Sequence, residues 1–401
     1  MADVRPFRAL RPRNDVAHEV ISPPYDVLTL DEALELARGK HHFVHVTRPE
    51  VDLPIGADAH SDEAYQKARA NLDALASSGI LIRDGEPTFY FYGQVMGEHR
   101  QIGILAGASV PEYLDGRIKK HEFTRPDKED DRTHHLETLN AQVGLVFLTY
   151  RASAALKDIT ARVVEVPPAW TVDSEDRVRH QFWPAPAHMV PEIQAAFANI
   201  DALYVADGHH RSAAASRVHQ ARKDDSSKYF LAGLFPDDEL HVMAYNRVVH
   251  TLNGLTPEAY LEAIQVNFTV DAGAPVRPAC RGQYSMYLGK TWYSLTPRPG
   301  LVDESDAVAR LDVAVLQNHL LGPILGIEDP RRSTNITFVG GIRGPEALVE
   351  AVDGGAAVAF SLFPTSLGEL FAVADAGQVM PPKSTWFEPK LRGGVVVRPL
   401  D

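Results

Sequence analysis

The stretch VADGHHR, residues 205–211, is the most informative part of this 401-residue sequence. It ends an apolar run, 202–206, that predicts a strand, and it leads into an alanine-rich segment, 211–221, that predicts a helix. Gly208 allows the backbone to turn sharply and to approach a ligand, and the free N–H groups at the start of a helix attract anions. The stretch therefore predicts a strand, a tight turn and a helix, with a phosphate site at the turn.

The side chains of this turn suit the same ligand. Arg211 can donate two parallel hydrogen bonds to phosphate, and His209 and His210 add donors beside it. Asp207 can hold a histidine tautomer or a divalent cation. A helix start with surface histidines is the alternative, but the density of polar groups favours the phosphate site. Because the sequence contains no GxxxxGK[ST] and no GxGxxG after a predicted strand, a different loop must hold the phosphate.

Outward from this turn, predicted helices and strands alternate along the whole chain. Hairpins are predicted at 88–110 and 284–295, with turns at 97–99 and at Gly289. Hairpins among helices favour the α+β class over a doubly wound sheet. We expect two parts, 1–240 and 241–401, without a clean linker between them. The other predicted helices are 30–38, 62–78, 154–163, 191–198, 257–266, 312–320, 345–352 and 367–376, and the other predicted strands are 146–150, 336–339 and 357–363.

Composition narrows the class of protein. The chain is 45% hydrophobic and 23% charged, which is typical of folded proteins, and its length suits about two or three domains. A net charge of −13 disfavours binding to the backbone of nucleic acids. The single cysteine, Cys280, excludes intramolecular disulfides and CxxC metal sites. Without an apolar run of about 18 residues or a signal-peptide pattern, we expect a cytoplasmic protein with no membrane contact.

A second polar cluster lies in the charged segment 111–137. His121 and Glu122 begin a stretch, HEFTR, that is similar to the HExxH motif of zinc peptidases, but Arg125 stands where the second histidine is needed. Glu122 is instead a candidate general base, kept ionised by the positive charge of Lys120 and its neighbours. Arg132 follows in the same segment. The alternative for the whole cluster is a solvated, salt-bridged surface.

A third cluster, PPKST, occupies residues 381–385. Its two prolines stiffen the backbone, and an ammonium group and two hydroxyls follow, from Lys383, Ser384 and Thr385. This combination suits a phosphate or a carboxylate. An ordinary surface loop explains the segment equally well.

Together the three clusters resemble the free-serine kinase family of the ParB/sulfiredoxin-like superfamily. That family pairs a strand-end Asp-Gly-His-His-Arg with an upstream His-Glu and a late Pro-Lys-Ser/Thr-Thr segment. Here the matching stretches are KKHE at 119–122, VADGHHR at 205–211 and PPKST at 381–385, in the same order along the chain. The resemblance implies an α+β fold with a ParB/sulfiredoxin-like nucleotide-binding core and large α/β additions, as in a longer bacterial branch of the family.

The resemblance also implies roles for individual residues. Glu122 is similar to the carboxylate that takes the proton from the substrate hydroxyl, and His209 and His210 join it as catalytic residues. Asp207 matches the position that holds Mg²⁺. The residues implied to bind the nucleotide are Lys120, His121, Arg132, Asp207, Gly208, His209, His210, Arg211, Lys383, Ser384 and Thr385.

The activity implied is transfer of a phosphoryl group from ATP or ADP to free L-serine or a similar small hydroxyl compound. Positive charge and positioning are what such a transfer requires, because charge spreads over the phosphoryl oxygens in the transition state. The motif does not choose between the two donors, and the sequence indicates no oligomeric state. A ParB-like nucleotide switch without kinase activity and a purely structural protein are the alternatives.

Overall fold

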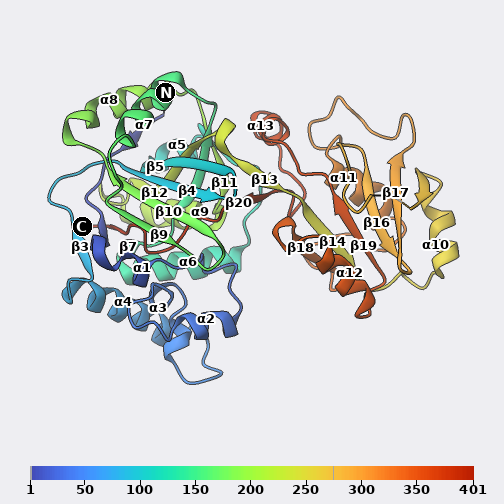
Figure 1. Ribbon diagram of the computed structural model, residues 1–401, viewed down its shortest axis with the longest axis horizontal. Coiled ribbons are helices and arrows are strands. Elements are labelled where there is room, and N and C mark those ends of the chain that lie inside the picture. The colour runs from blue at the N-terminus through green and yellow to red at the C-terminus, as the bar shows by residue number, and fades with distance from the viewer. Residues whose placement is uncertain (1, 274) are drawn as a thin grey trace. The chain divides into compact units, whose positions relative to one another are not determined.

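The computed structural model of the chain, shown in Figure 1, describes residues 2–273 and 275–401. Contacts divide it into two compact units. The first unit contains Met1–Lys120, Thr124–Leu240 and Pro389–Asp401, and the second contains His121–Phe123 and His241–Glu388. The division into two domains expected from the sequence stays a prediction, because a compact unit is not proven to fold independently.

The first unit is built on a mixed sheet of nine strands. Eight of them follow the order β6-β11-β8-β12-β5-β4-β10-β9, and β1 pairs with β5. The pairs β6–β11 and β8–β12 are parallel and the others are antiparallel. The strands are β1 (Val4–Arg5), β4 (Tyr90–Met96), β5 (His99–Ser109), β6 (Ile118–Lys119), β8 (Val146–Tyr150), β9 (Trp170–Asp173), β10 (Val178–Pro184), β11 (Leu203–Asp207) and β12 (Tyr229–Pro236).

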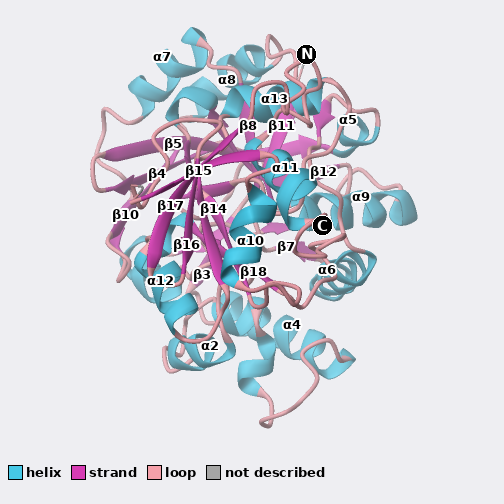
Figure 2. Ribbon diagram, turned by 90° about the vertical axis from the view of Figure 1, so that its right-hand side faces the viewer, coloured by secondary structure: helices cyan, strands magenta, loops and turns pink. Residues whose placement is uncertain are grey.

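Helices cover this sheet and close its core, which includes Phe91, Leu148 and Phe230. Helix α6 packs along α9, and α7 packs on α8 (Figure 2). Serine side chains at Ser61 and Ser153 accept hydrogen bonds from the first turns of α4 and α7 and fix where those helices begin. The helices are α1 (Ala17–Val20), α2 (Leu30–Leu36), α3 (Val44–Thr47), α4 (Asp62–Ser77), α5 (Val110–Leu114), α6 (Pro126–Leu139), α7 (Ala154–Val163), α8 (Val190–Phe197) and α9 (His209–Arg222).

The second unit contains a six-stranded antiparallel sheet in the order β15-β17-β16-β19-β14-β18, and a separate pair, β13–β20. Val248, Leu348 and Ala359 lie in its core. Its strands are β13 (His241–Met243), β14 (Tyr245–Val249), β15 (Phe268–Ala272), β16 (Tyr284–Leu288), β17 (Thr291–Pro297), β18 (Ile336–Gly340), β19 (Val358–Leu362) and β20 (Trp386–Glu388), and its helices are α10 (Pro257–Ile264), α11 (Asp312–Leu316), α12 (Glu346–Asp353) and α13 (Leu367–Asp375).

Short strands in the first unit complete the list: β2 (Leu10–Pro12) pairs with β3 (Leu81–Arg83), and β7 (Ala141–Gln142) pairs with β21 (Arg398–Pro399). This mixture of hairpins, helices and mostly antiparallel strands confirms the α+β class. Within the described ranges, no helix is both long and apolar enough to cross a membrane.

The charged segment 111–137 differs from the solvated surface that was one interpretation of it. It forms α5, β6 and most of α6, and α6 buries Leu136 and Leu139 together with Asp131 and His135. These four positions are spaced so that one face of the helix turns inward. The high density of charge in this segment concealed a helix with a buried face.

Candidate functional site

The turn between β11 and α9 has the predicted strand–turn–helix geometry. The helix begins at His209, two residues earlier than expected, and Gly208 caps it with φ 92°. That left-handed conformation favours glycine. A Cβ at position 208 would also lie 3.1 Å from the Cζ of Arg211. Gly208 is therefore required both for the turn and for the close approach of the guanidinium.

Asp207 is held by groups on both of its oxygens. Its Oδ2 accepts a hydrogen bond from Lys390 Nζ at 2.9 Å, and its Oδ1 accepts one from the Gly208 N–H at 2.7 Å. Burial opposes ionisation here, but the positive charges of Lys390 and Arg211 outweigh it and hold the pKa of Asp207 well below its usual range. Asp207 is therefore an anchored carboxylate that fixes the turn.

The guanidinium of Arg211 folds back over the sheet. It donates a hydrogen bond to the Leu145 carbonyl, and its Nη2 lies 3.9 Å from Asp26 Oδ2 and 4.0 Å from Asp207 Oδ1. A Cβ at Gly144 would lie 3.0 Å from the Arg211 side chain, so the absence of a side chain there makes room for this arrangement. Arg211 therefore turns toward the interior of the first unit, whereas the sequence suggested a donor at the mouth of the turn.

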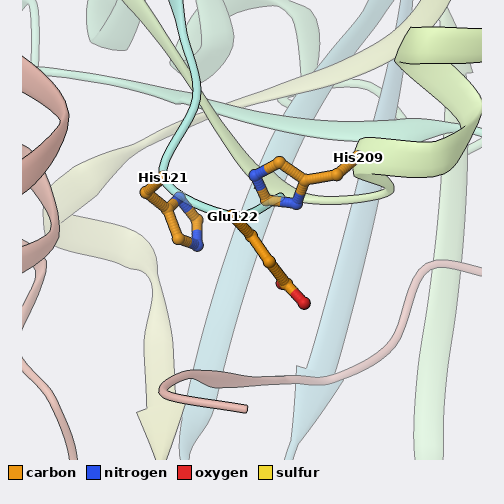
Figure 3. A group of neighbouring side chains, drawn as sticks. All are labelled: His121, Glu122 and His209. Atoms are coloured by element: carbon orange, nitrogen blue, oxygen red, sulfur yellow. The ribbon is translucent and has the colours of Figure 1, made fainter. Parts of the chain in front are cut away.

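His121, Glu122 and His209 form a compact polar cluster, shown in Figure 3. One nitrogen from each histidine and one carboxylate oxygen of Glu122 all lie within 4.8 Å of one another. Strand β6 pairs with β11, and this pairing brings the residues after β6 next to the start of α9. The two histidines are buried and Glu122 is half-buried. The cluster places a carboxylate where imidazoles can share or relay a proton.

Other predicted residues lie on the elements that flank this turn. Lys120 Nζ lies 4.3 Å from the centroid of the Tyr113 ring, a cation–π contact. Arg132 forms an ion pair with Asp131, in which its Nε and Nη2 lie 2.8 and 2.7 Å from the same oxygen, Oδ2. The Cζ of Arg132 lies 4.3 Å from the centroid of the Tyr25 ring. Both cations are therefore oriented by aromatic rings.

Asp207 is the carboxylate that the sequence predicts to hold magnesium. Both of its oxygens already accept hydrogen bonds, and Mg²⁺ needs oxygen ligands in regular octahedral geometry. The cluster of His121, Glu122 and His209 offers two nitrogens and one carboxylate, a donor set that suits transition metals better. The role of Asp207 in holding Mg²⁺ stays a prediction, and the chemistry below uses only groups of the chain.

The PPKST segment, residues 381–385, belongs to the second unit. Lys383 has φ 58°, and its carbonyl accepts a hydrogen bond from Arg247 Nη2 at 3.0 Å. The Ser384 carbonyl accepts a hydrogen bond from Thr365 Oγ1 at 2.9 Å, and the Ser384 hydroxyl donates to the Pro381 carbonyl at 2.5 Å. The Ser384 hydroxyl thus stabilises the loop itself, and its predicted contact with phosphate has no support in this arrangement.

Three groups that shape these sites lie outside the residues predicted from the sequence: Lys390, Arg247 and the Tyr25–Asp26 pair. Lys390 and Arg247 carry no local motif, because each acts on a residue more than 100 positions away. The pair at 25 and 26 follows two prolines, and a stiff segment that ends in polar side chains is a signal that could have been used.

The fold and the cluster define an α+β protein with a polar strand–turn–helix site. A family model described as "Protein of unknown function (DUF1015)" matches residues 4–314. The chain belongs to this family. No curated protein matches it.

Several solved structures are distantly similar to the chain. SbnI with C-terminal truncation from Staphylococcus aureus is 14% identical, with a TM-score of 0.41, over 74% of this chain and 87% of that one. A free serine kinase mutant in complex with ADP is 14% identical, with a TM-score of 0.36, over 71% and 87%. A conserved hypothetical protein from Pyrococcus furiosus is 13% identical, with a TM-score of 0.35, over 71% and 90%.

Proposed function

We propose that the protein is a nucleotide-dependent phosphotransferase that phosphorylates the hydroxyl of L-serine or a similar small metabolite, with ATP or ADP as donor and Mg²⁺ bound with the nucleotide. The observation that carries this proposal is the cluster of His121, Glu122 and His209 at the first turn of α9. The cluster joins two of the three motifs that resemble the free-serine kinase family. We also assign the first unit to the ParB/sulfiredoxin-like core on the basis of these motifs.

Glu122 is the proposed general base. The acceptor oxygen attacks the terminal phosphorus of the nucleotide, and a new O–P bond forms as the bond from that phosphorus to the bridging oxygen breaks. The bridging oxygen keeps the electron pair and leaves with the nucleotide. A carboxylate is too weak to deprotonate an alcohol beforehand, but it can accept the proton as the new bond forms. His121 and His209, within 4.8 Å of Glu122, can pass that proton on.

Positive charge and N–H donors at the turn are proposed to hold the phosphates. The N–H groups of the first turn of α9 point away from the helix and favour an anion, and the imidazoles of His209 and His210 add donors. Asp207 keeps this turn in place through Gly208 and Lys390. Lys383 and Thr385 of the PPKST segment are proposed to contact the nucleotide as well. Preorganised donors of this kind are the main source of catalysis in phosphoryl transfer.

Glu122→Gln tests the proposal. Purified protein is incubated with Mg²⁺, ATP or ADP, and L-serine, and phosphate monoesters are followed by phosphorus NMR. We expect the variant to lose turnover by about 10²–10⁴-fold, the usual contribution of a general base, with nucleotide affinity within about twofold of wild type. Glu137→Gln is the matched control, because Glu137 is exposed on α6 in the same charged segment. The control keeps full turnover.

Two results would contradict the proposal. One is the absence of any monoester with either donor under conditions where the nucleotide binds. The other is a Glu122→Gln variant that turns over as fast as wild type, which would favour the ParB-like nucleotide switch without kinase activity.

A further inference from the structure

A pocket in the first unit lies beside the β11–α9 turn but has a different character from it. The pocket has a volume of about 50 Å³ and is lined by residues of α6, α9, β7, β8, β12 and the segment that contains Tyr25. Since a water molecule needs about 10–15 Å³ on this scale, the pocket holds about four groups of that size. This is enough room for a carboxylate and the carbon attached to it.

Two guanidinium groups and a phenol lie in the wall of this pocket. Arg132 and Arg211 line it together with Tyr25, and the side chains of the two arginines are only 12% and 14% exposed. Arg132 is paired with Asp131. Among the described residues, Arg211 donates one side-chain hydrogen bond, to the Leu145 carbonyl. Its Nη2 lies 3.9 Å from Asp26 Oδ2 and 4.0 Å from Asp207 Oδ1, and both distances exceed that of a hydrogen bond. A guanidinium has five N–H donors, so Arg211 keeps several for a ligand.

The rest of the wall is mostly apolar and carries no negative charge. Leu136, Val146, Ala215 and Phe230 supply much of it, and no aspartate or glutamate is among the described lining residues. His135 also lines the pocket, and burial together with the charge of Arg132 lowers the pKa of this histidine to about 3, so its ring is neutral. The two guanidiniums therefore offer hydrogen-bond donors to an anion on one side of the pocket, whereas no described lining residue offers a carboxylate to an ammonium group.

We infer that this pocket binds the carboxylate of a small acid with a short carbon chain, and that the phosphoryl acceptor is a hydroxycarboxylate without an ammonium group. The bidentate geometry of Arg211 matches a carboxylate, and the apolar wall matches the carbons that follow it. Arg211 also lies 4.0 Å from Asp207, which connects the pocket to the proposed phosphate site. The identity of the acid as the acceptor rests on the proposed function, but its binding in the pocket does not.

Two pairs of compounds of similar shape and different charge test which charge the pocket binds. Glycerate carries a hydroxyl where L-serine carries an ammonium group, and propionamide is the uncharged counterpart of propionate. We expect kcat/KM for glycerate to exceed that for L-serine by at least tenfold. We also expect propionate to compete with glycerate, and propionamide to fail to compete. These measurements use the wild-type protein and need no variant.

A pair of variants on α9 tests whether propionate binds in this pocket. Ala215→Leu fills the pocket and should weaken propionate binding, measured by calorimetry, at least tenfold, with nucleotide affinity within about twofold. Ala221→Leu adds the same atoms at an exposed position of the same helix and should change neither affinity.

Three results would overturn the inference. The first is better turnover of L-serine than of glycerate, and the second is displacement of propionate by ADP in a competitive manner. The third is phosphoryl transfer without any binding of propionate. That result would rule out carboxylate binding in the pocket and would leave the proposed function intact. A different result is propionate binding that depends on Ala215, without phosphoryl transfer to any acceptor. It would contradict the proposed function and the identity of the acceptor, but it would support carboxylate binding in the pocket.

Discussion

Three buried or half-buried ionisable groups of the first unit differ from two such groups of the second in how their charge is accommodated. In the first unit, the buried histidines His135 and His180 are neutral, because burial and the nearby charges of Arg132 and Arg392 lower both pKa values to about 3. Asp207 of the same unit keeps its negative charge through its ion pair with Lys390. At these three positions the first unit therefore holds either an uncharged histidine or a charged group with a partner of opposite charge.

The second unit buries a guanidinium that has no carboxylate partner among the described residues, and it half-buries a carboxyl group whose pKa is raised. Arg247 is 3% exposed, and within the part of the chain that the structure describes it bonds to the carbonyls of Tyr245 and Lys383 and to no carboxylate. Burial lowers the pKa of Arg247 to about 10. Burial also raises the pKa of Asp312 to about 6, with Glu369 adding to the effect. The cost of desolvation is thus opposed by an ion pair at Asp207 of the first unit, whereas Arg247 of the second unit has no such partner among the described residues.

The two sites therefore differ in how their charges are balanced in the absence of a ligand. A site whose ions already balance one another is organised before any ligand arrives, as the β11–α9 turn is. A buried guanidinium bonded only to carbonyls keeps its full positive charge. The PPKST segment is therefore anchored by a charged group that has no carboxylate partner among the described residues, in contrast to the turn.

The largest expected effect is an opposite response of the two units to pH. A histidine whose folded pKa lies below its unfolded value, about 6.5, stabilises the fold above that value and loses this contribution as the pH falls. His135 and His180 should each cost the first unit about 1.4 kcal/mol per pH unit below 6.5, or about 2 kcal/mol each by pH 5. Asp312, whose folded pKa is raised, stabilises the second unit at low pH and loses this contribution as the pH rises toward 6. The second unit should gain about 1 kcal/mol between pH 7 and pH 5.

Hydrogen exchange at pH 5 and pH 7, corrected for the intrinsic rate, measures this response in each unit separately. His180→Gln should remove part of the slope in the first unit, whereas His18→Gln, at an exposed position, should leave it unchanged. A parallel loss of protection in both units on acidification would contradict the expected difference between them.

The second effect is the loss of a paired ion from the first unit. Asp207→Asn keeps an oxygen for the Gly208 N–H but removes the charge 2.9 Å from Lys390. Because the Asp207 side chain is 32% exposed, solvent screens part of the loss, and we expect the free energy of unfolding in urea to fall by about 1–2 kcal/mol. Asp238→Asn is the control, since Asp238 pairs with Lys157 on the surface, where both side chains are 46% exposed. The control should change stability by less than about 1 kcal/mol.

Particular residues show what could be predicted from the sequence. The ranges predicted for β8 and α7, 146–150 and 154–163, are confirmed without a shift, because apolar periodicity and the Ser153 cap are local signals. Strands β9 and β10 were missed. The pairing of β10 with β4, at Phe182 and Tyr92 for example, is a contact between distant segments that no local pattern reveals.

The candidate site divides in the same way. Gly208 and its neighbours could be predicted, because a turn after a strand has a local signature. The proximity of Glu122 to His209 could not, since it depends on the parallel pairing of β6 with β11 across more than 80 residues. The inward turn of Arg211 was also hidden, because it requires room above Gly144, far from it in the sequence.

The smallest expected effect on stability comes from Arg247→Met in the second unit. The change removes a costly buried charge but leaves the carbonyls of Tyr245 and Lys383 without a donor. These two consequences oppose each other, so we expect the free energy of unfolding to change by less than about 1 kcal/mol. The affinity for the nucleotide should nevertheless fall about tenfold, because Lys383, at φ 58°, loses the anchor that holds its backbone.

Arg298→Met is the matched control for this variant. Arg298 also donates to a carbonyl, that of Gln265 at 2.9 Å, but it is exposed and far in sequence from the PPKST segment. Urea unfolding and nucleotide calorimetry on both variants measure the two effects, and the control should change neither. If Arg247→Met destabilises the protein more than Asp207→Asn does, the buried guanidinium is compensated after all, and the contrast between the units fails. If stability holds and the nucleotide affinity is also unchanged, Arg247 does not position a nucleotide-binding loop, and the PPKST segment loses its proposed role.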